Sequence, residues 1–337
     1  MFFPIIRKMT LKPQPILRIE DLRISFKTED GIARAVDGVS FDVNRGETLG
    51  IVGESGCGKT VTALAIMRLI PCPPGRIEAG RIWLEDRDLL KLNKREMREI
   101  RGNKISMIFQ EPMTSLNPVY TVGDQIMEAI KLHHNGNRKD TLEKAIRMLE
   151  MVGIAEAETR IRAYPHQLSG GMRQRVMIAM ALSSHPVVLV ADEPSTALDV
   201  TIQGQILELI NELKARLGTA VVLITHDLGV IAETAQKVIV MYAGRIVEKA
   251  DVKMLFAKPL HPYTQGLLGS MPAPGNIRKK ERLIDIKGMV PKLTEMPEGC
   301  SFCPRCQKSM EVCRKMRPEP FEFKPDHWVS CWLYQKD

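Results

Sequence analysis

A glycine-rich stretch between an apolar run and a helical pattern limits the possible folds of this chain more than any other feature. It fits G-x-x-x-x-G-K-[ST] at every fixed position and reads Gly53-Glu54-Ser55-Gly56-Cys57-Gly58-Lys59-Thr60. The apolar run at residues 49–52 predicts a buried strand, and residues 60–70 predict a helix that Pro71 ends. Such a strand, turn and helix bring backbone N–H groups and the helix dipole onto one anion. The order predicts an α/β fold with a phosphate-binding loop.

The residue types in this loop suit the parts of a nucleotide. Glycines let the backbone curve around phosphate without a Cβ in the way. Lys59 is expected to reach the outer phosphates, and the Thr60 hydroxyl is expected to be a ligand of Mg²⁺. The remaining loop residues expected to contact the nucleotide are Gly53, Ser55, Gly56, Cys57 and Gly58.

Composition and charge exclude several classes of protein. With 44% hydrophobic and 26% charged residues, the 337-residue chain has the composition of an ordinary globular protein. No stretch approaches the roughly 20 apolar residues that cross a bilayer. Residues 1–8 place apolar residues before charged ones, the reverse of a signal peptide, so a cytosolic chain is expected. The net charge of +8 is scattered along the sequence, and nucleic-acid binding is not expected.

The patterns along the chain predict its organisation. Residues 16–43 alternate in short apolar runs, as in an antiparallel sheet, and residues 121–182 are helical in pattern. Residues 187–191 and 221–224 are continuous apolar runs typical of parallel strands covered on both faces. An amphipathic helix between them gives a right-handed crossover. The core is therefore predicted to be α/β, with a helical insertion at about 115–175.

Two carboxylates follow the apolar run at residues 187–191. In an ATPase with a phosphate loop, Asp192 would hold Mg²⁺ through its water shell. Glu193 would polarise the water that attacks the γ-phosphate. A surface acidic pair at a strand end would explain the same two residues equally well.

A second glycine-led helix start decides between these two interpretations. Ser169, Gly170 and Gly171 precede a predicted helix, and such an end binds anions. One chain seldom wraps a single nucleotide with two such ends. This end is therefore expected to serve the nucleotide of a neighbouring subunit.

The segment that contains these glycines resembles the LSGGQ signature of ABC-type ATP-binding cassettes, and it reads Leu168-Ser169-Gly170-Gly171-Met172. Met172 departs from the signature glutamine. The resemblance covers about residues 16–258 and implies a P-loop NTPase fold: a RecA-like core with an antiparallel β subdomain and a helical insertion. It also implies a head-to-tail pair with ATP between Lys59 of one subunit and Ser169 and Gly171 of the other. ATP binding would close this pair and hydrolysis would release it.

Other motifs of the cassette family match in order. Gln110 matches the glutamine that contacts the metal and the attacking water, so the implied magnesium set is Thr60, Gln110 and Asp192. His226 matches the switch histidine at the γ-phosphate. Asp199 ends the loop 195–199, which crosses the dimer interface in the family. Phe26 matches the aromatic that stacks on adenine, with a core residue as the alternative. The resemblance implies that the catalytic residues are Glu193, His226, Gln110 and Lys59.

The C-terminal part resembles the tail of dipeptide and oligopeptide importer ATPases. Its residues 258–268 contain His261-Pro262-Tyr263-Thr264 before an apolar run. The same relatives carry a distal cysteine pattern, which implies that Cys300, Cys306, Cys313 and Cys331 are ligands of a [4Fe-4S] cluster. Zinc is the second possibility and free thiols the third, because four thiolates can hold either centre. Cys303 departs from the family pattern and leaves one ligand open.

The resemblance implies an ATP-hydrolysing subunit of a peptide importer on the cytoplasmic face of the membrane. Its expected domains are a cassette at 16–258 and a cysteine-rich extension at 259–337. The expected partners are two transmembrane permease subunits, a second ATP-binding subunit and an extracytoplasmic peptide-binding protein, with no nucleic acid. A soluble ABC-type ATPase acting on nucleic acid or ribosomes is the alternative, but such proteins usually join two cassettes or insert long coiled coils. A third possibility is a redox or metal-sensing module with a vestigial ATPase.

Overall fold

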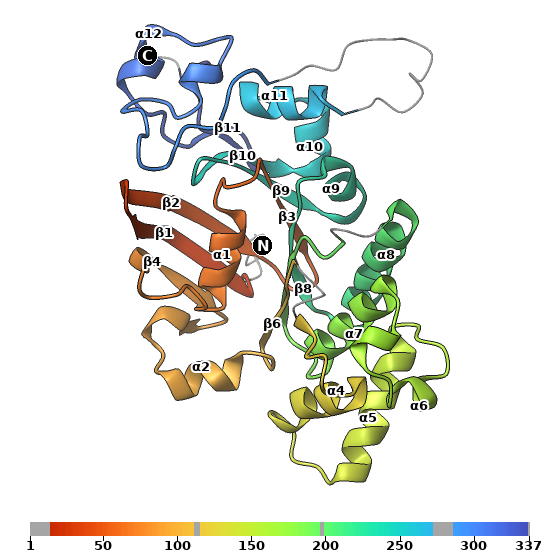
Figure 1. The fold of residues 1–337 in the computed structure, drawn as a ribbon. Helices are drawn as coiled ribbons and strands as arrows, with labels where there is room; N and C mark the ends of the chain where they lie inside the picture. The colour runs from red at the N-terminus through yellow and green to blue at the C-terminus, as the bar shows by residue number, and fades with distance from the viewer. Residues whose placement is uncertain (1–13, 111–114, 196–198, 272–285, 336–337) are drawn as a thin grey trace, which may run out of the picture.

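The chain folds around two β-sheets (Figure 1). The structure is a computed structural model and describes residues 14–110, 115–195, 199–271 and 286–335. One sheet has four strands in the order β2-β1-β4-β5, and the other has eight in the order β11-β12-β10-β9-β3-β8-β7-β6. The mixture of antiparallel and parallel pairing confirms the predicted α/β class.

The smaller sheet is antiparallel, as predicted for residues 16–43. It consists of β1 (Leu17–Thr28), β2 (Gly31–Val43), β4 (Gly75–Leu84) and the short β5 (Arg87–Asp88). The apolar runs at 17–19 and 22–26 form one strand rather than two. They are joined by a bulge, where Asp21 has a φ of 42°. Helix α2 (Lys94–Ile100) follows this sheet and leads to the larger one.

The centre of the larger sheet is parallel and covered on both faces. Its strands are β3 (Thr48–Val52), β6 (Ile105–Ile108), β7 (Val188–Asp192), β8 (Ala220–Ile224) and β9 (Lys237–Tyr242). Every residue of β3, β7 and β8 is buried, which explains their continuous apolar sequences. The predicted strands at 49–52, 187–191 and 221–224 are confirmed within one residue at each end.

The helices of this core differ in length from the predicted ones. Helix α1 (Lys59–Ile66) ends four residues before the predicted end at residue 70, because Arg68 has a φ of 51° and leaves the helical conformation. Helix α8 (Val200–Leu217) connects β7 to the adjacent parallel strand β8, as predicted for a crossover. Helix α9 (Leu228–Thr234) follows β8.

A helical subdomain lies at one end of the molecule (Figure 1). It contains α4 (Val122–Lys131), α5 (Arg138–Met151), α6 (Ala157–Arg160) and α7 (Gly170–Leu182), which confirms the predicted helical region. Polar side chains cap three of these helices, namely Thr121, Asn137 and Ser169. Leu149 and Val152 are buried in its core, whereas Leu142 is 37% exposed.

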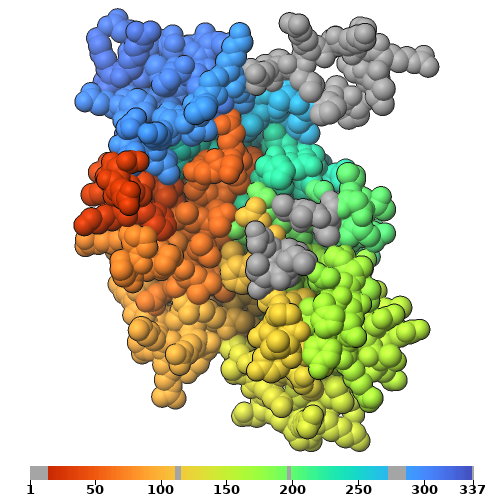
Figure 2. All heavy atoms as spheres, viewed as in Figure 1, coloured from red at the N-terminus to blue at the C-terminus, as the bar shows by residue number. Residues whose placement is uncertain are grey.

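The C-terminal extension continues the larger sheet rather than forming a sheet of its own. It begins with α11 (Pro262–Gly269), which follows α10 (Val252–Ala257) of the cassette. It ends with α12 (Glu311–Lys315), β11 (Phe321–Lys324) and β12 (His327–Val329). Strand β12 pairs with β10 (Arg245–Asp251), which pairs with β9. In Figure 2 the extension (blue) lies next to the first strands of the antiparallel sheet (red), above them in this view.

A buried carboxylate anchors this extension to β10. Glu248, which is 1% exposed, accepts hydrogen bonds from the backbone N–H groups of Leu260 (2.8 Å) and His261 (2.9 Å). The His327 Nε2 lies 2.8 Å from the same carboxylate. Because a buried charge is costly unless it is paired and hydrogen-bonded, these contacts explain how Glu248 can lie inside the sheet.

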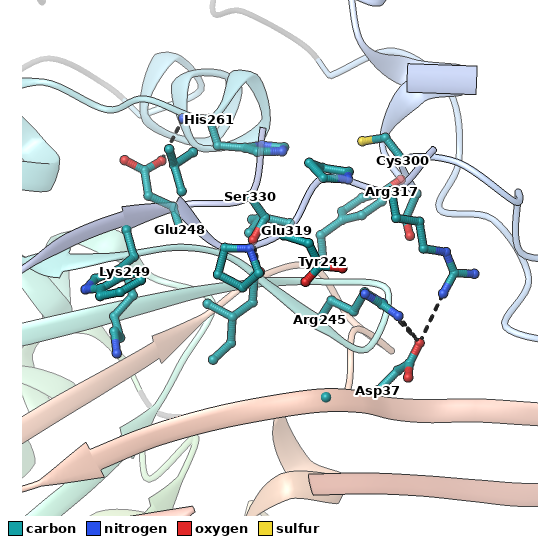
Figure 3. A pocket seen from close by; sticks show the side chains of 18 of the residues that line it. Asp37, Tyr242, Arg245, Glu248, Lys249, His261, Cys300, Arg317, Glu319 and Ser330 are labelled. Carbon is teal, nitrogen blue, oxygen red and sulfur yellow. Dashed lines mark hydrogen bonds and ion pairs between the residues drawn. The ribbon is translucent and has the colours of Figure 1, made fainter. Parts of the chain in front are cut away.

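A second carboxylate, Asp37 of β2, joins the antiparallel sheet to the extension. It pairs with Arg245 of β10 and with Arg317 of the extension, at 2.5 and 3.3 Å, beside a cavity of about 390 Å³ (Figure 3). Arg23 of β1 also pairs with it at 2.7 Å. Burial alone would raise the pKa of Asp37, but the bonds from Arg245 and the charges of the other two arginines lower it below its usual value.

Candidate functional site

The phosphate loop joins β3 to α1, and its glycines have conformations that other residues avoid. Gly53 and Gly58 have φ values of 153° and 103°. A Cβ at Gly58 would collide with the carbonyl oxygen of Ala35, and one at Gly53 would collide with that of Met241. These close approaches explain why only glycine fits at either position.

Lys59 is held inside this loop. Its ammonium donates to the carbonyl oxygens of Gly53 (2.7 Å) and Glu54 (3.0 Å), and the residue is only 6% exposed. The ammonium therefore lies within the loop that is expected to bind phosphate.

Thr60 and Asp192 meet beside the loop. The Thr60 hydroxyl donates to Oδ1 of Asp192 over 3.3 Å, and Asp192 is 1% exposed at the end of β7. Burial, together with the charge of Glu193, raises the pKa of Asp192, while Thr60 and Lys59 lower it in part. A hydroxyl and a carboxylate oxygen are the kind of hard donors that Mg²⁺ prefers, so this pair fits the predicted magnesium site.

Glu193 lies between two side chains from neighbouring strands. The Gln110 Nε2 is 3.1 Å from Glu193 Oε2, and the His226 Nδ1 is 3.3 Å from Glu193 Oε1. Gln110 follows β6, Glu193 follows β7 and His226 follows β8, so all three lie at the carboxyl edge of the sheet. Glu193 itself has a φ of 46° and donates its N–H to Ile224.

The signature segment begins α7 in the helical subdomain. Ser169 caps this helix through its hydroxyl, which accepts the N–H of Met172 at 3.3 Å. Gly170 and Gly171 form its first turn, which leaves backbone N–H groups free at the N-terminus. Helix α7 packs against α4, α5, α8 and β6.

Asp199 and Phe26 have structural contacts of their own. The Asp199 carboxylate caps α8 by accepting the N–H of Ile202 at 2.9 Å. Residues 196–198 of the predicted interface loop lie outside the described residues. Phe26 pairs with Gly75 at the end of β1 and is partly buried against the core of the antiparallel sheet.

Gln174, to which no role was predicted from the sequence, connects α7 to the segment that follows β7. Its side chain is buried, and its Nε2 donates to the carbonyl oxygen of Pro194, the residue after Glu193. The sequence signal that could have identified Gln174 is a glutamine among the apolar residues of α7.

The predicted cluster thiols lie near one another but do not surround a single ion. Cys313 and Cys331 are buried, and Cys300 and Cys306 are partly buried. Burial, with a smaller contribution from the neighbouring thiols, raises the pKa of Cys300 and of Cys331 to about 11. In the part of the chain that the structure describes, no group of three or more His, Cys, Asp or Glu side chains is placed to hold a metal ion.

Comparisons with known proteins agree with the arrangement of the phosphate loop, the signature helix and the C-terminal extension. Residues 36–196 match the family described as ABC transporter, and residues 247–313 match the oligopeptide/dipeptide transporter C-terminal region. A probable peptide ABC transporter ATP-binding protein of Sinorhizobium fredii is 56% identical over 95% of this chain and 96% of its own. The oligopeptide transport ATP-binding protein AppD of Bacillus subtilis is 50% identical over 96% and 98%.

The solved structures point to the same class. A dimeric post-hydrolysis state of the ATP-binding cassette MJ0796 with ADP and Pi superposes with a TM-score of 0.63 at 26% identity, covering 70% of this chain and 98% of that one. The fold and the site define an ATP-binding cassette ATPase. The chain belongs to the family of ABC transporter ATP-binding proteins with the oligopeptide/dipeptide transporter C-terminal region. No helix within the described ranges has the length and apolar character required to cross a membrane.

Proposed function

We propose that this chain hydrolyses ATP as the nucleotide-binding subunit of an ABC importer of di- and oligopeptides. The observation that carries the proposal is the position of Glu193 between Gln110 and His226, beside the phosphate loop. The Bacillus subtilis relatives are named as oligopeptide and dipeptide transport ATP-binding proteins, which supports peptide as the cargo. These relatives do not favour a soluble ATPase acting on nucleic acid or ribosomes.

In this proposal the three side chains divide the chemistry of hydrolysis. Glu193 accepts a proton from the attacking water, Gln110 orients that water, and His226 contacts the γ-phosphate. Lys59 binds the outer phosphates, and Mg²⁺ held at Thr60, Asp192 and Gln110 neutralises their charge. Phe26 stacks on adenine. The backbone N–H groups of residues 53–58 complete the phosphate site.

We further propose that two such subunits close head to tail around ATP. The N-terminus of α7, with Ser169, Gly170 and Gly171, carries partial positive charge and so suits the nucleotide of a partner. Asp199 stands at the start of α8, where the adjoining loop would cross the interface. The solved cassette named above is a dimer, which supports this assembly.

The same proposal places the chain on the cytoplasmic face of the membrane against two permease subunits, with an extracytoplasmic binding protein delivering peptide. A cavity of about 310 Å³ supports a docking site for a permease helix. Phe109, Leu132, Met177 and Met180 line it, between the core and the helical subdomain. Residues 111–114, which adjoin Gln110, lie outside the described residues.

The division of the chain at residues 16–258 and 259–337 is also a proposal. The match at residues 247–313 supports a distinct C-terminal unit, although β10 and β12 pair across the boundary. We propose that this extension holds a [4Fe-4S] cluster, with zinc as the second choice. Four thiolates on a cubane cluster each bind a different iron, so they need not converge on one point as zinc ligands do.

The chemistry around the four sulfurs fits such a cluster. The Cys313 Sγ accepts the backbone N–H of Met310 at 3.4 Å, as cluster sulfurs do in proteins. Backbone N–H groups of Phe302, Lys308 and Leu333 lie near the other three sulfurs and partly offset the effect of burial on their pKa. Cys303 is less buried and lies beside Arg314, so it is left out of the ligand set. Brown protein absorbing near 400 nm would support the cluster, and colourless protein with stoichiometric zinc would reject it.

Reconstitution tests the transport function. The chain, two permeases and a peptide-binding protein in vesicles should take up labelled peptide only with ATP, and a Glu193→Gln subunit should abolish uptake. Hydrolysis that nucleic acid stimulates and that never couples to peptide uptake would overturn the proposal in favour of the alternative.

A further inference from the structure

Among the described residues, Glu54 of the phosphate loop forms hydrogen bonds with the C-terminal extension. Its backbone N–H donates to the hydroxyl of Tyr263 at 2.9 Å. Its carboxylate lies 2.8 Å from the Nη1 of Arg305. The carbonyl oxygen of the same residue accepts the Lys59 ammonium at 3.0 Å. Backbone and side chain of Glu54 are therefore both held, and two of the three contacts come from the extension.

Arg305 is fixed in place before it reaches Glu54. Its Nη2 donates to the carbonyl oxygen of Ile286 (3.1 Å) and its Nε to that of Lys287 (3.2 Å). The guanidinium carbon lies 5.8 Å from the ring centroid of Tyr242, and the side chain is 6% exposed. An arginine held along the Nε–Nη2 edge of its planar guanidinium presents its remaining nitrogen in one direction.

Tyr263 is equally constrained. It is fully buried near the start of α11, and its ring packs against Tyr242 and Phe302 with centroid distances of 4.8 and 5.4 Å. Its hydroxyl is thus a rigid partner for the N–H of Glu54 rather than a side chain that swings on the surface.

The charge of Glu54 makes the Arg305 contact more than a structural one. Glu54 is the acidic residue within Gly53–Thr60, the loop proposed to bind the triphosphate. A carboxylate there repels phosphate unless a cation neutralises it. Arg305 supplies that cation from 251 residues further along the chain.

We propose that Arg305 and Tyr263 are positioning residues of the nucleotide site, through which the C-terminal extension sets the affinity for ATP. They hold the loop in one conformation before nucleotide arrives, which lowers the entropy lost on binding. Arg305 also cancels the negative charge of Glu54. The proposal rests on the proposed ATPase function, and both residues act through their contacts with Glu54.

The test measures nucleotide binding and steady-state hydrolysis in the full chain. Arg305→Met should weaken ATP and ADP binding by roughly tenfold or more and raise KM in proportion. It should leave kcat at saturating ATP unchanged, because Glu193, Gln110 and His226 are not altered. Lys315→Met is the matched control, since that lysine also belongs to the extension but forms an exposed ion pair with Glu311. The Lys315→Met substitution should change neither the dissociation constant for ATP nor KM.

A second variant separates the charge effect from a general loss of structure. Adding Glu54→Gln to Arg305→Met removes the carboxylate that Arg305 neutralised, so the double variant should bind ATP within roughly threefold of the wild-type chain. If the double variant binds ATP as weakly as Arg305→Met alone, the charge argument is wrong. Unchanged binding in Arg305→Met would overturn the proposal.

Two further measurements keep the outcome decisive. If Arg305→Met does not fold, Tyr263→Phe removes only the hydroxyl and should weaken ATP binding roughly threefold at an unchanged melting temperature. Unaltered binding in that variant would refute the proposal. A wild-type chain that binds ATP but does not hydrolyse it would instead refute the proposed function and leave the affinity test intact.

Discussion

The side-chain amide of Gln110 donates a hydrogen bond of 3.1 Å to the carboxylate of Glu193. The two residues follow β6 and β7, which are neighbours in the parallel sheet, so the sheet itself sets their separation. His226, after the next strand, contacts the other carboxylate oxygen. Glu193 is therefore oriented from both sides and can face a water only along a restricted direction.

This orientation leads to a prediction for Glu193→Gln. The amide keeps the size of the side chain but cannot accept a proton, so turnover should fall by roughly 10²–10⁴ while ATP still binds. The closed dimer should accumulate with ATP, which size-exclusion chromatography would detect. Glu212→Gln, exposed on α8, is the matched control and should hydrolyse ATP normally. Normal hydrolysis by Glu193→Gln would show that the role of Glu193 is misassigned.

The close approach at Gly58 predicts a sharp effect of one methyl group. Gly58→Ala places a Cβ against the carbonyl oxygen of Ala35 at a φ of 103°, so the loop must shift. We expect ATP affinity to fall at least about tenfold, measured by calorimetry. Gly204→Ala on α8, where nothing lies within 4 Å, should instead stabilise the chain by about 0.5–1 kcal/mol. Equal effects of the two substitutions on ATP affinity would contradict this reasoning.

Asp37 should be a stabilising residue, because it holds three arginines from different parts of the chain. Asp37→Asn leaves those guanidinium groups without their shared anion, and we expect the free energy of unfolding to fall by about 2 kcal/mol. The expected loss in the free energy of unfolding is smaller than for a fully buried ion pair, because Arg23, Arg245 and Arg317 are partly exposed. Arg18→Gln, which breaks a surface pair with Glu20, should cost less than about 1 kcal/mol in the same denaturant titration.

His261 predicts a loss of stability in mild acid. Burial lowers the pKa of its imidazole to about 4, although the charge of Glu248 opposes the shift. The unfolded chain takes up a proton near pH 6.5 and the folded chain does not, so stability is lost as pH falls from about 6.5 to 4. The loss should approach about 3 kcal/mol at the lower end.

The comparison that checks it is His261→Asn. Asparagine can still accept the Tyr263 N–H at the start of α11 but does not titrate. Thermal unfolding followed from pH 7 to 4 should show a flatter dependence for this variant. The same steep decline in both proteins would show that other groups cause the acid sensitivity.

Much of the parallel core was predictable because its physical signal is local. The strands at 49–52, 187–191 and 221–224 are buried on both faces, so each is a continuous apolar run. The convergence of Gln110, Glu193 and His226 also follows from strand order, since the carboxyl ends of parallel strands share one edge. Gln110 and His226 were assigned through the resemblance to the cassette family, and the strand order explains why they meet Glu193.

The C-terminal part was not predictable in this way. Strand β10 carries Glu248 at a buried position, and the sequence alone gives no sign that its partners come from residues 260, 261 and 327. The contacts of Arg305 and Tyr263 with Glu54 join segments more than 200 residues apart. Such pairs depend on how the extension packs, which periodicity and turn signals do not report.

The pairing of β12 with β10 has a consequence for the exposed edge of the larger sheet. Without the extension, β10 would be an uncovered sheet edge, a template on which other chains can add strands. In the whole chain the outermost strand is instead β11, only four residues long and bearing Glu322 and Lys324. Short, charged borders of this kind discourage aggregation. The extension that contacts the phosphate loop thus also covers the β10 edge of the sheet and prevents other chains from adding strands to it.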